Sequence, residues 1–211
     1  MSIRIDNVDV YGFEAAIRGM RSPKNSWDKS DSCWSSPNEN GTDKPMYIIG
    51  ENDLKLMHTL AAAGQDHGKF LRMIHVQLDV TAPLYWWKEA DTYSVGVVKN
   101  SCSTMHKIHS KEFTIDDFSH EHLYSPLHDL KPTVDLLNVY RERFIETKDK
   151  EDWWQLIQLL PSSFNQRRTW DLNYAVLRNI YHARRNHKID EWHTLCDWIE
   201  TLPYAKELIC G

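Results

Sequence analysis

The segment Ile74–Val80 constrains the fold most, because its apolar residues alternate strictly with polar or charged ones (IHVQLDV). A period of two places the two sets of side chains on opposite faces of a β-strand, so the segment predicts a half-buried strand that needs a sheet to pair with. Ala82-Pro83 follows. Proline suits the first turn of a helix, where its missing N–H has no partner to lose. We therefore expect a strand followed directly by a helix with Pro83 in its first turn.

Most of the remaining chain has helical periodicity. A first strand is expected within residues 3–10, and a long Ser-, Asn-, Asp- and Pro-rich loop over residues 22–45, in which Trp27 and Trp34 suggest packing onto the rest of the chain. Helices are predicted over residues 13–20, 51–61, 132–144, 153–160, 172–183 and 192–199. The pattern indicates one α+β domain over residues 1–211, mostly helical with a small antiparallel or mixed sheet.

Composition excludes several classes of protein. The net charge is −5, whereas nucleic-acid binders usually carry a basic surplus, so no nucleic-acid partner is expected. A local basic patch of Arg178, Arg184, Arg185 and Lys188 would still suit the phosphates of a small nucleotide. The four cysteines form no CxxC pair and indicate free thiols in a reducing compartment. With no signal peptide and no membrane-length apolar run, we expect a cytoplasmic protein without a membrane partner.

The order of several segments resembles the flavin-dependent thymidylate synthases over nearly the whole chain. Val10–Arg18 is similar to that family's opening strand and helix, Leu60–His67 to its helix and Gly-His-containing loop, and Leu160-Pro161 to its Leu-Pro turn. Trp170-Asp171-Leu172-Asn173 then fits its Asn-containing helix. The resemblance implies a thymidylate synthase complementing protein-like fold and a homotetramer with FAD and deoxyuridylate (dUMP) between subunits. Family members methylate dUMP to dTMP with methylenetetrahydrofolate and NADPH.

The resemblance also implies two sets of site residues. The cofactor-binding set is His67, Asn173, Asn179 and Ser22. The substrate-binding set is Arg184, Lys88, Tyr93 and Lys99, in which Tyr93 could stack on a flat ring and the two lysines flank the signature region. From the residue types alone, each of the two asparagines is more often a helix-capping or packing residue, and Arg184 also fits a cation that stabilises a helix C-terminus.

The family's Arg-His-Arg signature is missing. Counted from Ala82-Pro83, its positions fall on Thr92-Tyr93-Ser94, and the downstream Ser, Glu, Ser and Arg fall on Val97, Asn100, Cys102 and Thr104. Arginines offer fixed forks of charged donors to phosphate and flavin, which hydroxyls do not replace. No catalytic residue is therefore assigned.

Three hypotheses follow. The first is a diverged homologue that binds a nucleotide or flavin without the standard methylation of dUMP. The second is an active FAD-dependent thymidylate synthase, or a related nucleotide-modifying enzyme, with a rewritten site. The third is a metal-binding protein that uses the histidine-rich segment 106–128, although no spacing there matches a zinc template and we assign no metal ligand.

Overall fold

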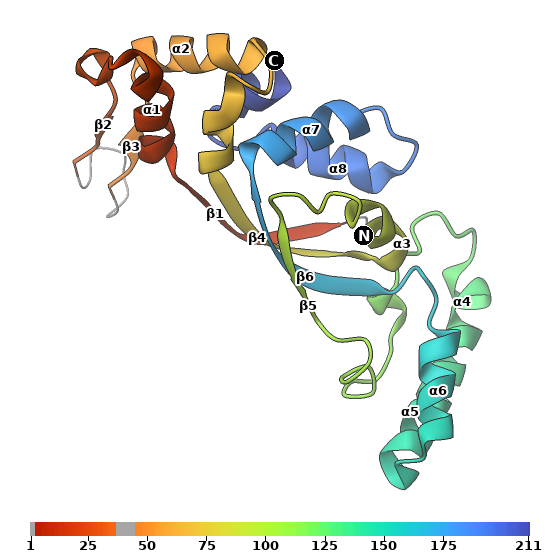
Figure 1. The fold of residues 1–211 in the computed structure, drawn as a ribbon. Helices are drawn as coiled ribbons and strands as arrows, with labels where there is room; N and C mark the ends of the chain where they lie inside the picture. Colours follow the sequence, from red (N-terminus) through yellow and green to blue (C-terminus); the bar gives the residue numbers. More distant parts are fainter. Residues whose placement is uncertain (1–2, 37–44) are drawn as a thin grey trace. The chain divides into compact units, whose positions relative to one another are not determined.

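The computed structural model describes residues 3–36 and 45–211 (Figure 1). Its helices are α1 Phe13–Arg21, α2 Glu51–Ala62, α3 Leu84–Ala90, α4 Pro126–Asp129, α5 Lys131–Thr147, α6 Lys150–Leu159, α7 Tyr174–Arg184 and α8 Asp190–Ile199. Its strands are β1 Arg4–Tyr11, β2 Cys33–Trp34, β3 Tyr47–Ile48, β4 His75–Pro83, β5 Val98–Ser101 and β6 Asn165–Asn173. Short helical turns are η1 Ser22–Lys24, η2 Trp27–Lys29, η3 Gly68–Met73, η4 Ile115–Asp117 and η5 Lys206–Cys210. None of the described helices is long and apolar enough to cross a bilayer.

The main sheet has four antiparallel strands in the order β1-β4-β6-β5, so the predicted α+β class is confirmed (Figure 1). Strand β4 is the alternating segment, and its even-numbered residues Val76, Leu78 and Val80 are buried. A second sheet pairs β2 with β3, with Cys33 opposite Ile48.

Two sequence expectations were wrong around β6 and Pro83. Residues 165–173 form a strand, and Leu172 belongs to it rather than to the next helix. Helix α7 starts one residue after Asn173, because the Asn173 side chain accepts a hydrogen bond from the Val176 N–H and caps the helix. Pro83 ends β4 in an extended conformation (ψ 150°), so α3 begins at Leu84 with the proline as its cap.

By contacts the chain divides into two compact units. The first takes in residues 1–7, 78–94 and 99–170. Its core holds three mutually edge-packed indoles, Trp86, Trp87 and Trp170, with ring centroids 4.8–6.0 Å apart. All three side chains are fully buried. A second cluster packs Phe113, Phe118 and Phe164 with helices α5 and α6.

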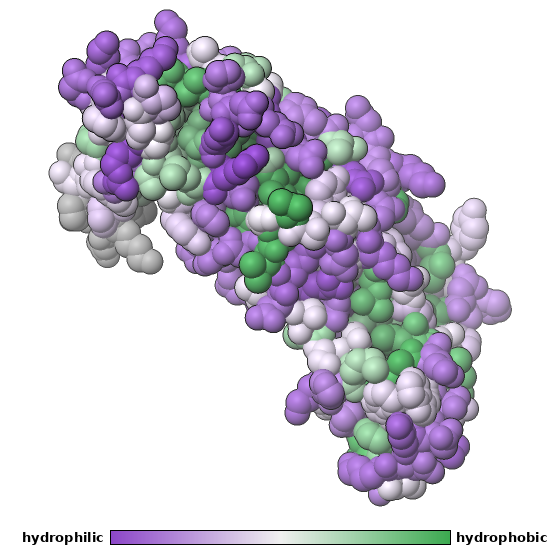
Figure 2. Space-filling view, viewed as in Figure 1, coloured by the Kyte–Doolittle hydropathy of each residue, from purple (hydrophilic) through white to green (hydrophobic). Residues whose placement is uncertain are grey.

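Hydrophobic side chains also reach the surface over α4, α5 and α6, where Figure 2 shows them among charged residues. Leu127, Leu136 and Val139 are 73%, 42% and 50% exposed.

The second unit takes in residues 8–77, 95–98 and 171–211. Much of its predicted long loop of residues 22–45 is ordered by hydrogen bonds to α1; residues 37–44 of that loop lie outside the described part. Trp27 donates to the Arg18 carbonyl (3.2 Å) and Trp34 to the Glu14 carboxylate (3.3 Å). The two tryptophans therefore pack the loop onto α1, as predicted.

A buried carboxylate also fixes this loop. Asp53 on α2 accepts from Arg21 Nε (2.6 Å), and its other oxygen accepts from the hydroxyls of Ser30 and Ser32 (both 2.6 Å). Asp31 in turn accepts from the Asn52 and Asp53 N–H groups, which have no partner within the first turn of α2. The loop and the helix thus satisfy each other's polar groups.

Candidate functional site

A cavity of about 560 Å³ in the second unit contains the two predicted asparagines. It is built by the end of α2, the Gly64–Gly68 turn, η3, residues 95–96 and the first turns of α7. Its lining includes Gly64, Gln65, Arg72, Gly96, Asn173, Val176, Arg178, Asn179 and His182. Cavities of a few hundred Å³ hold small-molecule ligands in other proteins.

Asn173 positions one wall of this cavity. It is 6% exposed, and besides capping α7 it points its amide at the Gly96 carbonyl, 3.5 Å away. Gly96 has a φ of +71°, and a Cβ there would lie 3.1 Å from the Asn173 amide nitrogen. Glycine therefore lets the 95–96 turn approach Asn173 closely. Asn179 is exposed on α7 and its side chain makes no hydrogen bond within the described residues, so its amide is open to the cavity.

The titratable side chains named in the cavity lining are basic. Arg72, Arg178 and His182 line the cavity, whereas none of its lining residues within 3–36 and 45–211 is Asp or Glu. Arg178 is held in place because it donates to the Leu208 carbonyl at 3.0 Å, whereas Arg72 is exposed and makes no ion pair within the described residues. The N-terminus of α7 adds the positive end of a helix dipole. This set of donors suits an anion, such as the phosphate of a nucleotide.

The other two predicted cofactor-binding residues are not among those that line the cavity. His67 is exposed in the turn between Gln65 and Gly68, which both line the cavity. Ser22 begins η1, and its hydroxyl donates to the Arg18 carbonyl (2.9 Å).

The predicted substrate-binding residues belong to two different units. Arg184 ends α7 in the second unit with its guanidinium 4.9 Å from the Trp192 ring centre, whereas Lys88, Tyr93 and Lys99 belong to the first unit. Of the basic patch singled out in the sequence, only Arg178 lines the cavity. Sequence reasoning missed Arg72, which only the fold places beside α7, and His182, which lies within α7.

The histidines of segment 106–128 have separate partners. The His109 ring packs on Phe144 (4.8 Å), and its burial lowers the pKa of that imidazole. His120 Nδ1 lies 2.8 Å from the Phe118 carbonyl, and His128 Nδ1 lies 2.8 Å from Asp129. Across residues 3–36 and 45–211, no group of three His, Cys, Asp or Glu side chains is arranged to hold a metal ion. The structure thus gives the metal-binding hypothesis no support.

Comparison with known proteins identifies solved structures that share this fold. No protein-family model and no curated protein sequence matches the chain. Among solved structures, Thymidylate Synthase X (ThyX) from Helicobacter pylori, crystallised with FAD and dUMP, superposes with a TM-score of 0.70 over 99% of this chain and 97% of that one, at 14% identity. A second Helicobacter pylori ThyX structure with FAD and dUMP gives 0.67 at 16% identity, covering 99% and 98%.

The chain has the fold of the flavin-dependent thymidylate synthases. A related match is the UMP/dUMP methylase PolB from Streptomyces cacaoi, bound with 5-Br dUMP, with a TM-score of 0.66 at 14% identity over 100% of this chain and 96% of that one. The full-length coverage confirms the sequence resemblance at the level of fold.

On this flavin-dependent thymidylate synthase fold, the segment that replaces Arg-His-Arg is a turn closed by internal contacts. Lys99 Nζ donates to the Ala90 carbonyl (2.8 Å), the Tyr93 carbonyl (3.1 Å) and the Asp91 carboxylate (3.1 Å). An ammonium has three N–H donors, so all of them are in use. Lys99 therefore caps the carboxyl end of α3, where unpaired carbonyls favour a cation.

Arg168 completes this turn. Its Nη1 donates to both oxygens of Asp91 (2.8 and 3.1 Å), and its guanidinium lies 4.3 Å from the Trp87 ring centre. Its side chain is only 15% exposed. Sequence reasoning missed Arg168 because it lies in the strand that was not predicted. Lys88, by contrast, is exposed on α3 and makes no ion pair within the described part of the chain.

Proposed function

We propose that this chain binds a nucleotide or a flavin nucleotide on the flavin-dependent thymidylate synthase fold and does not carry out the standard methylation of dUMP. The observation that carries the proposal is the cavity of the second unit. It combines Asn173 and Asn179 with Arg72 and Arg178, and none of its described lining residues carries a carboxylate.

The chemistry of this cavity fits the phosphorylated part of FAD. Two guanidiniums and a helix N-terminus favour an anion. The Asn179 and Gln65 amides can both donate and accept, which suits a ribityl chain or a base edge. Arg72, Arg178 and Asn179 would hold the nucleotide, and Asn173 would position the wall. Bound flavin would supply hydride chemistry.

The second half of the proposal rests on the turn that replaces the family signature. Methylation of the uracil ring needs positive charge where negative charge develops. Thr92, Tyr93 and Ser94 carry none. Of the nearby cations, Lys99 and Arg168 are paired with Asp91, and Lys88 is exposed on α3. For Lys99 to bind a substrate phosphate, it would have to release the end of α3. We therefore infer that the scaffold is retained without the charges that the reaction uses.

A flavin titration with two matched variants tests the binding half. The quenching of FAD fluorescence would be followed for the wild type, Arg72→Gln and Lys69→Gln. Both changes remove one exposed cation from η3, but only Arg72 lines the cavity. We expect Arg72→Gln to weaken binding about tenfold through loss of a charge-assisted contact, and Lys69→Gln to leave it unchanged. Equal effects of the two variants would show that the cavity is not the site.

A turnover assay tests the other half. Purified protein would be supplied with dUMP, methylenetetrahydrofolate, FAD and NADPH, and dTMP would be measured. We expect no dTMP above the background without protein, and no difference between the wild type and Arg184→Ala. Turnover of dUMP that Arg184→Ala abolishes would instead establish an active enzyme with a rewritten site.

A further inference from the structure

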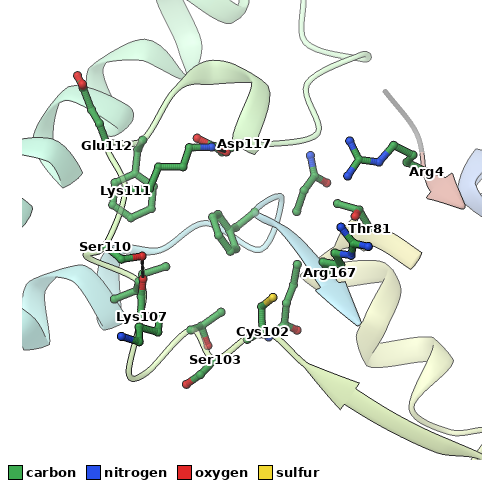
Figure 3. Close-up of a pocket in the computed structure, with 16 residues that line it drawn as sticks. Arg4, Thr81, Cys102, Ser103, Lys107, Ser110, Lys111, Glu112, Asp117 and Arg167 are labelled. Atoms are coloured by element: carbon green, nitrogen blue, oxygen red, sulfur yellow. Dashed lines mark hydrogen bonds and ion pairs between the residues drawn. The ribbon is translucent and has the colours of Figure 1, made fainter. Parts of the chain in front are cut away.

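A second cavity, of about 330 Å³, lies wholly within the first unit (Figure 3). The nucleotide proposal does not use it. Three adjacent strands of the sheet meet there: Arg4 comes from β1, Thr81 from β4 and Arg167 from β6. Figure 3 shows these three side chains together at one end of the cavity.

This end is built to receive an anion. Arg4 uses its Nε for Asp6 (2.8 Å), and Arg167 uses one Nη for Asp79 (2.6 Å). A guanidinium has five N–H donors, so each arginine keeps donors for a further acceptor. Asp79 also accepts from Thr169 (2.6 Å) and Asn7 (2.7 Å), and these bonds with Arg167 hold the pKa of Asp79 well below its usual range. Asp79 is thus committed to its own partners.

Thr81 supplies a second, independent sign of a ligand. Its hydroxyl oxygen is buried and has no hydrogen-bond partner among the described residues. A buried polar group without a partner costs free energy, so native structures usually satisfy it with protein, water or ligand. The Thr81 hydroxyl lies between the two arginines in strand order, where an anion's oxygen would accept its proton.

The body of the cavity is apolar. Ile108, Phe113 and Phe164 line it, and the two phenylalanine rings pack edge to face with centroids 6.2 Å apart. These walls belong to the second hydrophobic cluster of the unit, which keeps them rigid. Aromatic side chains of this kind favour a flat apolar group.

Two polar side chains of the walls are engaged within the protein. Gln166 donates to the Cys102 carbonyl (2.6 Å) and accepts from Arg168 (3.0 Å), and the Asn165 oxygen accepts from Ser119 (3.0 Å). Gln166 therefore has little capacity left to bind a ligand. The opposite end carries Lys107, Glu112 and the Lys111–Asp117 ion pair (Figure 3).

We propose that this cavity binds a small organic carboxylate with a flat apolar body. Arg4, Arg167 and the Thr81 hydroxyl hold the carboxylate, and Phe113, Phe164 and Ile108 surround the body. The site therefore recognises a negative charge at one end and an apolar group in the body of the cavity.

The thiol of Cys102 can report ligand binding, because Cys102 lines the same cavity and is exposed and free to react with an alkylating reagent (Figure 3). The full-length protein would be alkylated with iodoacetamide in the presence of 2-naphthoate, and labelling of each cysteine followed by peptide mass spectrometry. We expect 2-naphthoate to protect Cys102 and to leave Cys33, exposed in the other unit, unprotected. The neutral analogue 2-naphthamide, dUMP and inorganic phosphate would be run in parallel and should protect Cys102 less.

Two variants, each of which removes one positive charge, test at which end of the cavity the carboxylate binds. Arg4→Gln should weaken 2-naphthoate binding about tenfold, whereas Lys107→Gln, at the other end, should change it less than about twofold. Thr81→Val, which removes a hydroxyl without a partner at nearly constant volume, should fold normally and also weaken binding.

Four results would overturn the proposal: no protection of Cys102 by 2-naphthoate, equal protection by 2-naphthamide, equal losses in Arg4→Gln and Lys107→Gln, or stronger protection by dUMP. The last would assign the cavity to a nucleotide instead.

Discussion

Replacing Asp53 by asparagine should remove most of what holds the loop after α1 in place. Asp53 is fully buried and accepts five hydrogen bonds: one oxygen from Arg21, the other from the hydroxyls of Ser30 and Ser32 and the N–H groups of Asp31 and Ser32. An amide has only one accepting oxygen. Whichever way the introduced amide turns, its NH₂ group faces donors, and Arg21, itself 5% exposed, loses its counter-charge.

The expected loss in the free energy of unfolding is large compared with that of a typical domain. Breaking one side of a buried ion pair costs about 3–5 kcal/mol, out of a total of roughly 5–15 kcal/mol. Urea unfolding followed by tryptophan fluorescence measures it. The control is Glu51→Gln, which removes an exposed carboxylate from the same helix and should cost less than about 1 kcal/mol.

The pH dependence gives an independent check. Burial alone would raise the pKa of Asp53, but hydrogen bonds from Ser30, Ser32 and Arg21 outweigh it and lower that pKa. A carboxyl with a lowered folded-state pKa stabilises the protein fully above its unfolded pKa of about 4, and this contribution is lost as the pH falls from there toward the lowered value. Wild type should therefore lose more stability than Asp53→Asn in that acid window. A variant within about 1 kcal/mol of the Glu51→Gln control, or with the acid profile of the wild type, would refute this reasoning.

Four further predictions concern stability, the signature turn, the thiols and assembly. Gly12→Ala should lower the melting temperature far more than Gly64→Ala, because both residues have positive φ but only a Cβ at Gly12 would lie 2.0 Å from the Met73 carbonyl oxygen; similar melting temperatures would contradict this. Lys99→Met should make the 91–97 turn more sensitive to limited proteolysis without weakening FAD binding, and a loss of FAD affinity would show that Lys99 binds ligand. Cys196 should react with iodoacetamide more slowly than Cys33, since burial raises the pKa of the Cys196 thiol to about 11; equal rates measured by mass spectrometry would argue against that burial. Light scattering after gel filtration should give four times the 24.9 kDa chain mass if the proposed homotetramer forms, and a monomer mass would exclude it.

The strongly periodic elements could be predicted from the sequence. Strand β4 was evident because every second residue is apolar and buried, and α1, α2, α5, α6 and α8 because their apolar residues recur at helical spacing. The four-residue strand β5 passed unnoticed because its sequence, VKNS, has a single apolar residue.

Strand β6 was missed for a different physical reason. Its inward face is Gln166, Arg168, Trp170 and Leu172, of which only the last two are apolar. The polar pair is stabilised there by specific partners, the Cys102 carbonyl for Gln166 and Asp91 for Arg168. Such pairing depends on tertiary contacts that no local pattern encodes.

The candidate site was predictable only in part. The family resemblance pointed to Asn173 and Asn179, and the fold places both on one cavity. Nothing in the local sequence marks Arg72, which reaches that cavity through the packing of η3 beside α7. Likewise, Lys99 looked like a spare cation near the altered signature, and only the structure shows its three donors in use. The assigned roles of the site residues remain predictions.

The most direct test of the proposed function is a visible absorption spectrum of the protein after gel filtration with excess FAD. Our account predicts a flavin band that co-elutes with the protein and is reduced in Arg72→Gln, together with no formation of dTMP from the same sample. A protein peak without a flavin band, and without a shift in melting temperature on addition of dUMP, would contradict it, because the cavity beside α7 would then bind neither a flavin nor a nucleotide.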